Sequence, residues 1–304
     1  MFVLYNVMAF LTQPLTGMLA DRVRQRHLLL LSAVALLAIG GLIVSSWALA
    51  GHGDRNFDPS LGQVPVPVTR AVPFALALVL GAGNSLFHVW GGKQTVDTLG
   101  NNPKALGTFV STGALGLAVG VVFFSWMLLA TMITLTALLS AMYVFMDTKT
   151  SRYQDSKASR LQGIGNTRLV TIVTVSVVVL LVMFRSFVSR GFSMPVGELT
   201  GTLAGNAGVL LVGLVSMLGK MFGGWLAWWM GMARSMLLVL FVVFFCYLSA
   251  AAGSVIPLLP GLFAVNCTMP VTLCVANSAM HGREGLAFGL LAAALVPGYL
   301  LAIS

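Results

Sequence analysis

The sequence predicts an all-α integral membrane protein, a helical bundle with about ten transmembrane helices. Hydrophobic residues make up 58% of the 304 positions and charged residues only 8%, a composition that excludes a soluble globular domain. The apolar residues also form long runs, each close to the ~20 residues that a helix needs to cross a bilayer. The predicted spans are Phe2–Ala20, Leu28–Ala50, Val72–Gly91, Leu106–Phe124, Met127–Met146, Leu169–Val188, Ala204–Trp229, Met236–Ala250, Ile256–Ala279 and Gly285–Ile303.

The distribution of basic residues predicts which side of these spans faces the cytoplasm. Of the 17 Lys and Arg residues, four fall on one side: Arg55, Arg70, Arg185 and Arg190. The other thirteen gather on the opposite side, which the positive-inside rule places in the cytoplasm. The net charge of +9 is therefore explained by topology in a bilayer, and we expect no nucleic-acid partner.

No pattern in the chain indicates an enzyme. Cys246, Cys267 and Cys274 all lie in apolar runs, without the spacing of a metal site or a disulfide framework. There is no phosphate-binding loop and no pairing of a nucleophile with a base. We therefore expect neither a cofactor nor a bound metal.

A motif that occurs twice indicates two related halves. The stretch from Gly17 to Arg26 joins the first span to the second, and a similar stretch from Gly224 to Arg234 joins two later spans. One motif at matching places is typical of a duplicated membrane protein. The predicted divisions are an N-terminal helical half at 1–146, a solvated cytoplasmic linker at 147–168 and a C-terminal helical half at 169–304.

A second correspondence supports the same register. Asn84–His88 corresponds to Asn266–Pro270, and each is followed by a polar turn and a similar helix start. These starts are Leu106–Phe109 and Leu286–Gly289, which pairs Gly107 with Ala287.

The first copy of the motif resembles a known family. Gly17, Asp21, Arg22 and Arg26 form the pattern G-x-x-x-D-R-x-x-x-R, which is similar to the loop between helices two and three of the major facilitator superfamily. The stretches Tyr5–Pro14, Gly83–His88 and Gly219–Gly224 look like a bacterial subgroup related to fosmidomycin-resistance-type exporters. In the register of such twelve-helix transporters the chain lacks helices one and twelve. We therefore expect the parental gene to encode a further apolar span on each side.

The resemblance also implies a gate. In that superfamily the acid of the loop motif docks at the start of helix eleven when the cytoplasmic side is closed. Asp21 ends a helix whose dipole disfavours an anion there, whereas the helix that starts near Gly285 presents unpaired N–H groups. Trp228 replaces the acid in the second copy. The expected gating residues are Gly17, Asp21, Arg22, Arg26 and Glu284, with the arginines tying Asp21 to Glu284.

Polar residues within the spans are candidates for solute binding, because burying them in a bilayer is costly. Gln13 and Lys220 each precede a motif glycine by four residues, and His88 follows Asn84 by four, which places it on the same helix face. The candidate set is Asn6, Gln13, Asn84, His88, Lys220 and Asn266.

Structural alternatives remain open for these residues. Lys220 could extend to the cytoplasmic surface, and His88, Asn6 and Asn84 could serve only packing or interhelical hydrogen bonding. Arg185 is either an anchor at the membrane boundary or a group that attracts anions. The glycine face formed by Gly113, Gly116 and Gly120 is expected to pack closely against another helix, with a coupling role as the alternative.

Together these features predict a secondary active transporter in the cytoplasmic membrane of a bacterium. It would move a small polar or anionic solute by alternating access, as a monomer, with proton-coupled efflux through His88 as one option. The alternative is a membrane scaffold or sensor that keeps the fold without the transport cycle. Solute, bilayer lipid and protons are the expected partners.

Overall fold

The computed structural model describes residues 2–23, 26–47, 71–123, 126–150, 168–204 and 206–302, and all regular structure within these ranges is helical. The prediction of an all-α protein is confirmed. In chain order the elements are α1 (Phe2–Asn6), the π-helix η1 (Val7–Leu11), α2 (Gln13–Arg22), α3 (Arg26–Trp47), α4 (Ala71–Leu99), α5 (Pro103–Val122), α6 (Trp126–Thr150), α7 (Arg168–Ala204), α8 (Ala207–Met230), α9 (Met232–Ala251), α10 (Leu258–Ala279), α11 (Glu284–Ala293) and α12 (Leu295–Leu301).

Seven helices in the described part of the chain are long and apolar enough to cross a membrane. They are α4, α5, α7, α8, α9, α10 and the pair α11–α12 taken together. The outer faces carry large apolar side chains: on α9, Leu237, Phe241 and Phe244 are all more than half exposed. Continuous apolar surface of this kind suits lipid contact and is uncommon on a soluble monomer. The chain therefore has the architecture of a multi-pass membrane protein.

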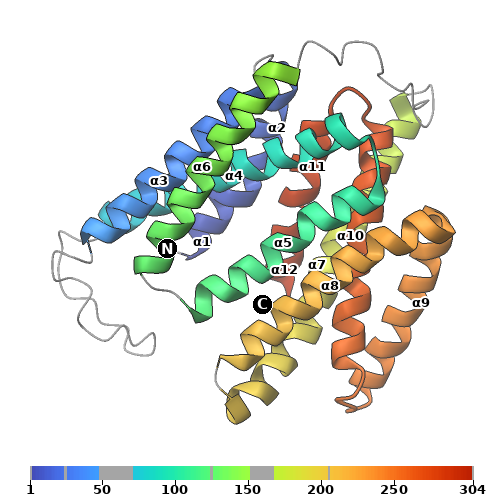
Figure 1. Ribbon diagram of the computed structural model, residues 1–304. Coiled ribbons are helices and arrows are strands. Elements are labelled where there is room, and N and C mark those ends of the chain that lie inside the picture. The colour runs from blue at the N-terminus through green and yellow to red at the C-terminus, as the bar shows by residue number, and fades with distance from the viewer. Residues whose placement is uncertain are drawn as a thin grey trace.

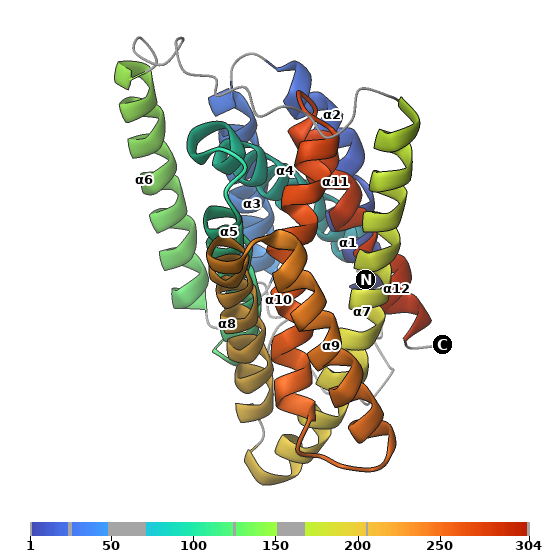
Figure 2. The same cartoon turned by 90° about the vertical axis from the view of Figure 1, so that its right-hand side faces the viewer.

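The bundle is organised around α10. This helix runs through the middle of the packed helices and contacts α5, α7, α8, α9 and α11 (Figure 2). Its apolar stretch is 72% buried, against 17% for α9, so α10 is central and α9 peripheral. Helices α3 and α6 lie at one side of the bundle and α9 at the opposite side (Figure 1).

Local signals explain where several helices begin. The side chain of Asn102 accepts a hydrogen bond of 3.0 Å from the Lys104 N–H, and Pro103 follows at the first helical position of α5. Both are preferred at a helix N-terminus. Gly231, between α8 and α9, has a φ of +90°, a conformation that suits glycine, so the chain turns sharply there.

Two predicted spans differ from the observed helices. The first is interrupted by η1, because Pro14 has no backbone N–H and the turn before it widens. The span predicted at Leu169–Val188 is too short, since α7 continues to Ala204. Arg190 therefore lies within α7 and not in an outer loop.

Part of the predicted organisation lies outside the described residues. Residues 124–125, at the connection before α6, belong to this group, as do residues 151–167 of the predicted linker. At the edges of that linker, residues 147–150 continue α6 and Arg168 begins α7.

Candidate functional site

The C-terminal end of α2 meets the N-terminal end of α11 at one end of the bundle (Figure 2). Asp21 accepts two backbone hydrogen bonds there, Oδ1 from the Gly285 N–H and Oδ2 from the Leu286 N–H, both at 2.9 Å. These N–H groups lie in the first turn of α11 and have no partner within their own helix. The carboxylate thus caps a helix that begins more than 260 residues later in the chain. We call this contact the clamp, and its end of the bundle the clamp end.

Glycines allow the two backbones to approach closely beside the clamp. A Cβ on Gly17 would overlap the carbonyl of Gly285, and a Cβ on Gly289 would overlap the carbonyl of Gln13. Gly17 therefore lies in the contact between α2 and α11. The position requires glycine because the neighbouring atoms are backbone atoms, which cannot move aside as a flexible side chain can.

Lys93 connects the acids around the clamp. Its Nζ lies 3.5 Å from Asp21, 3.4 Å from Asp97 and 3.6 Å from Glu284. These four side chains form the lysine cluster, and each is at most 16% exposed. Glu284 also accepts a hydrogen bond of 2.8 Å from the Gly282 N–H, which holds the turn before α11. One ammonium group thus joins α2, α4 and α11.

Arg22, the first arginine of the motif, does not take the expected role. Arg22 is exposed and forms no ion pair with the residues that the structure describes, so the prediction that it ties Asp21 to Glu284 is wrong. Lys93 does this instead, because its position on α4 faces the junction of α2 and α11. Arg26 begins α3, but its side chain lies outside the described part.

A second close contact joins α5 and α8. A Cβ on Gly224 would overlap the carbonyl of Pro103, and a Cβ on Gly107 would lie 2.8 Å from the carbonyl of Lys220. The acid of the first contact is replaced here by an aromatic group. The Lys104 Nζ lies 3.1 Å from the ring centre of Trp228 and 4.0 Å from that of Trp225. This contact is a cation–π interaction, and the start of α5 is capped by its own Asn102.

The two contacts repeat in one register. Gln13 and Gly17 correspond to Lys220 and Gly224, a separation of 207 positions in both cases (220 − 13 and 224 − 17). Their partners, Gly285 and Gly289, correspond to Pro103 and Gly107, a separation of 182 (285 − 103 and 289 − 107). The pairing of Gly107 with Ala287 is therefore wrong by two residues. The similar residue types at the two helix starts were misleading. The interhelical contacts, and not the residue types, define which positions of the two halves correspond.

Gln13 and Asn266 are buried and bonded mainly to their own helices. The Gln13 Nε2 donates to the Ala9 carbonyl at 2.7 Å, and the Asn266 Nδ2 donates to the Leu262 carbonyl at 2.8 Å. Asn266 also lies 3.4 Å from the hydroxyl of Ser216 on α8. The Gln13 Oε1 has no hydrogen-bond partner among the described residues, so this side chain keeps a free acceptor.

Ser85 is a polar residue on α4 that sequence reasoning missed. It is fully buried, and its hydroxyl lies 3.0 Å from those of both Thr12 and Thr16. The neighbouring Asn84 is only half-buried, as is Asn6 on α1. A serine carries little signal in an apolar helix, but Thr12 and Thr16 share a face of the facing helix and could have indicated a hydrogen-bonding partner.

Three basic residues lie on different helices of the bundle: Arg185 on α7 is buried, whereas Lys220 on α8 and His88 on α4 are half-buried. We call these three residues the cationic set. His88 stacks edge-on against Phe109, with ring centres 6.5 Å apart. Among the described residues, none of the three forms a salt bridge with a carboxylate.

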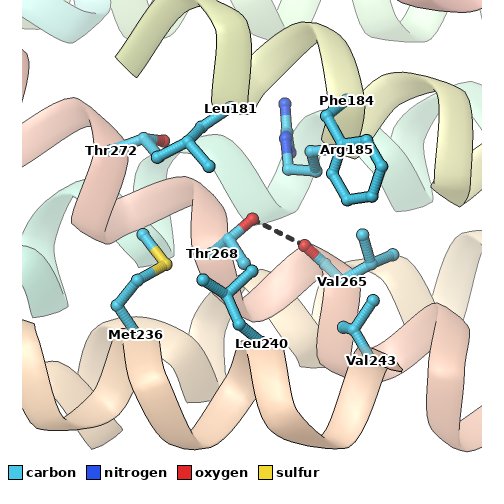
Figure 3. A pocket seen from close by; sticks show the side chains of 9 residues that line it. All are labelled: Leu181, Phe184, Arg185, Met236, Leu240, Val243, Val265, Thr268 and Thr272. Carbon is cyan, nitrogen blue, oxygen red and sulfur yellow. Dashed lines mark hydrogen bonds between the residues drawn. The ribbon is translucent and has the colours of Figure 1, made fainter. Parts of the chain in front are cut away.

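Arg185 lies between two small cavities. One is bounded by α7, α9 and α10, where Arg185 and Phe184 stand side by side opposite Thr268 and Val265 (Figure 3). The other is bounded by α7, α10 and α11 and includes Met269. Each has room for about one water molecule. A solute larger than water therefore requires these helices to move apart.

Among the residues that the structure describes, none packs closely against the glycine face of α5. A Cβ on Gly116 or Gly120 would meet no atom of the described chain within 4 Å, and one on Gly113 would touch only the His88 ring, at 3.7 Å. The expectation of close helix packing at this face is wrong. The contact of α5 with α8 instead uses Gly107 and, against Gly213, Ala118.

Comparison with known proteins adds no relative. No protein-family model matches the chain, and a search of the curated proteins found no match. Its function is therefore inferred from the clamp, the α5–α8 contact and the cationic set.

Proposed function

We propose that this chain is a secondary active transporter that moves a small polar or anionic solute across the cytoplasmic membrane by alternating access. Its two halves would rock as in the major facilitator superfamily, whose loop motif it resembles. His88 and Lys220 would contact the solute, with Asn84, Gln13, Asn266 and Asn6 nearby in the helices that move.

The observation that carries this proposal is the clamp. Asp21 joins the end of one helix to the start of another by side-chain-to-backbone hydrogen bonds, beside the close approach of the two helices at Gly17 and Gly289. Such a contact can open by rotation of rigid helices, which leaves the helices themselves intact. The α5–α8 contact in the same register supports the division into two related halves.

The cationic set supports a solute site behind the clamp. Its members come from α4, α7 and α8, so they belong to both proposed halves. Residues that meet from both halves can release a solute when the halves move, because the site is then divided.

One observation favours a scaffold instead: the cavities beside Arg185 hold about one water molecule each. A protein that never opens would keep them in this form. In a transporter, the cavities would be this small only in the closed state.

Labelling at Met269 distinguishes the two functions. Met269 lines one of these cavities, and we expect Met269→Cys, with the three native cysteines replaced by alanine, to react with a membrane-impermeant maleimide from either face of the membrane. The reason is that an alternating-access protein exposes its interior to each face in turn. Labelling from one face only, or from neither, would support the scaffold. A probe enclosed in the vesicles controls for leakage of the reagent.

A further inference from the structure

Arg185 is buried within the bundle and does not lie at the membrane surface. It is near the middle of α7, with 17 residues of the helix before it and 19 after it. The side chain is only 8% exposed, and it lines two cavities between α7 and the helices α9, α10 and α11. A boundary anchor keeps its charged group at the lipid headgroups, so the interpretation of Arg185 as an anchor is wrong.

The guanidinium has no hydrogen-bond or ion-pair partner in the described chain. Its Nε is buried without a hydrogen bond, and the side chain forms no ion pair with a described residue. An arginine in a membrane interior is normally paired with a carboxylate or with backbone carbonyls, because an unpaired buried charge is strongly unfavourable. The hydroxyls of Thr268 and Thr272 beside it donate to carbonyls of their own helix (Figure 3). The guanidinium therefore keeps its donors for an acceptor from outside the described chain.

The walls around this charge are apolar. Leu240 of α9 and Val265 of α10 line one cavity, and Leu273 of α10 and Phe288 of α11 line the other. Among the described residues that line the two cavities, Arg185 alone carries a charge. A ligand in this place would meet one positive charge surrounded by hydrocarbon. One negative charge on an otherwise apolar molecule matches these surroundings, whereas a second negative charge would be buried without a partner.

We propose that Arg185 binds the carboxylate of an organic monoanion whose remaining part is apolar, such as an aromatic or short-chain monocarboxylic acid. The planar guanidinium matches the two oxygen atoms of a carboxylate with parallel hydrogen bonds. The same contact neutralises the buried charge, and the cavity walls remove the apolar part of the ligand from water. This inference rests on the proposed transport function, and it narrows the solute to this class of acids.

Binding requires the surrounding helices to separate. Each cavity has room for about one water molecule, which is too small for a ring or an alkyl chain. The two cavities share Arg185 and Thr272, so a movement of α7 away from α10 would join them into one site. The ligand therefore selects a more open conformation.

Thermal unfolding of the purified protein in detergent at pH 7.5 tests the site. Sodium benzoate and sodium hexanoate carry both the charge and the apolar part. Benzamide and hexanamide lack the charge, and sodium acetate lacks the apolar part. Sodium chloride at equal ionic strength controls for general salt stabilisation, which grows without saturation.

We expect a saturable rise in the unfolding midpoint with benzoate, hexanoate or both, because a ligand that binds only the folded protein stabilises it. Acetate should bind more weakly by about tenfold or more, since it buries much less apolar surface. The two amides should give no saturable rise.

Variants of Arg185 separate binding from a structural role. Arg185→Gln and Arg185→Met should abolish the saturable rise, and Arg185→Lys should weaken the apparent affinity by about tenfold or more, because lysine keeps the charge but loses the planar fork. Without ligand, Arg185→Met should unfold at the same temperature as the parent protein or higher, since it removes an unpaired buried charge. Arg190→Gln should keep the rise. Arg190 is a matched control, because it lies on the same helix with an equally unpartnered Nε but packs against Tyr299, at 5.3 Å.

The proposal is overturned if neither benzoate nor hexanoate gives a saturable rise in the parent protein, or if Arg185→Gln keeps that rise. Equal binding of acetate or of the amides would also contradict it, because recognition would then need only the charge or only the apolar part. A lower midpoint of ligand-free Arg185→Met would show that the guanidinium stabilises the fold and is not reserved for a ligand. The assay needs no transport and Met269 labelling needs no ligand, so failure of one leaves the other proposal standing.

Discussion

Replacing Asp21 with Asn is expected to release the clamp and to shift the population toward the state that is open at the clamp end. Both carboxylate oxygens accept backbone hydrogen bonds from α11, and an amide can replace only one of them. The amide also loses the negative charge that the N-terminus of α11 favours. We expect a shift of about 1–3 kcal/mol, roughly 5- to 150-fold in the ratio of the two states. Labelling of Met269→Cys from the clamp face should rise by a similar factor.

Asp97→Asn provides the matched control for this experiment. Asp97 lies 3.4 Å from the same Lys93, whereas the two hydrogen bonds to the start of α11 come from Asp21. Asp97→Asn therefore changes the local charge equally and leaves those two bonds in place. Its labelling should stay close to that of the parent protein. If Asp21→Asn and Asp97→Asn give the same rate, Asp21 acts only through charge and is not a clamp.

Gly17→Ala is expected to prevent the closed state even more strongly. The added methyl group would overlap the Gly285 carbonyl, so α2 and α11 must separate at the clamp end. Overpacking of this kind costs about 1–3 kcal/mol, and here it also pulls Asp21 away from the N–H groups of α11. The unfolding midpoint should fall while labelling of Met269→Cys from the clamp face rises.

Gly116→Ala is the control for the glycine substitution. No described atom lies within 4 Å of a Cβ at Gly116, and alanine is favoured over glycine inside a helix by about 0.5–1 kcal/mol. This variant should be as stable as the parent protein or slightly more so. Equal behaviour of Gly17→Ala and Gly116→Ala would contradict the close approach of α2 and α11.

The helices could be predicted from the sequence because bilayer insertion requires long apolar runs, and such runs are readable from composition alone. The hydrogen-bonding partner of Asp21 was also predictable. An anion at the C-terminal end of its own helix needs a donor elsewhere, and the start of a later helix on the same side provides one.

Contacts between helices were harder to predict. Lys93 lies within an apolar helix and was counted only for topology, although its spacing of four from Asp97 indicates an ion pair on one helix face. The ion pair between Lys93 and Asp21 depends on how α2 and α4 pack. No local sequence pattern indicates that packing. The depth of Arg185 was missed for a similar reason. The end of α7 was placed at the first charges, but charged residues can lie within a membrane helix where they face the interior.

Glycine patterns were ambiguous in the same way. Gly17, Gly224 and Gly116 occur in similar apolar surroundings, yet the first two touch a neighbouring backbone and the third faces open space. Small residues permit close packing but do not require it, so only the positions of the neighbouring helices distinguish these cases.

The central claim, that the clamp end and the opposite end open in alternation, is tested most directly by two distances measured with spin labels. Arg22 and Met232 are exposed at the clamp end, and Leu42 and Ile256 are exposed at the opposite end. Asp21→Asn should lengthen the first distance and shorten the second, because rocking halves open one end as they close the other. If both distances stay unchanged, or change in the same direction, the chain does not rock about a central site and the account is contradicted.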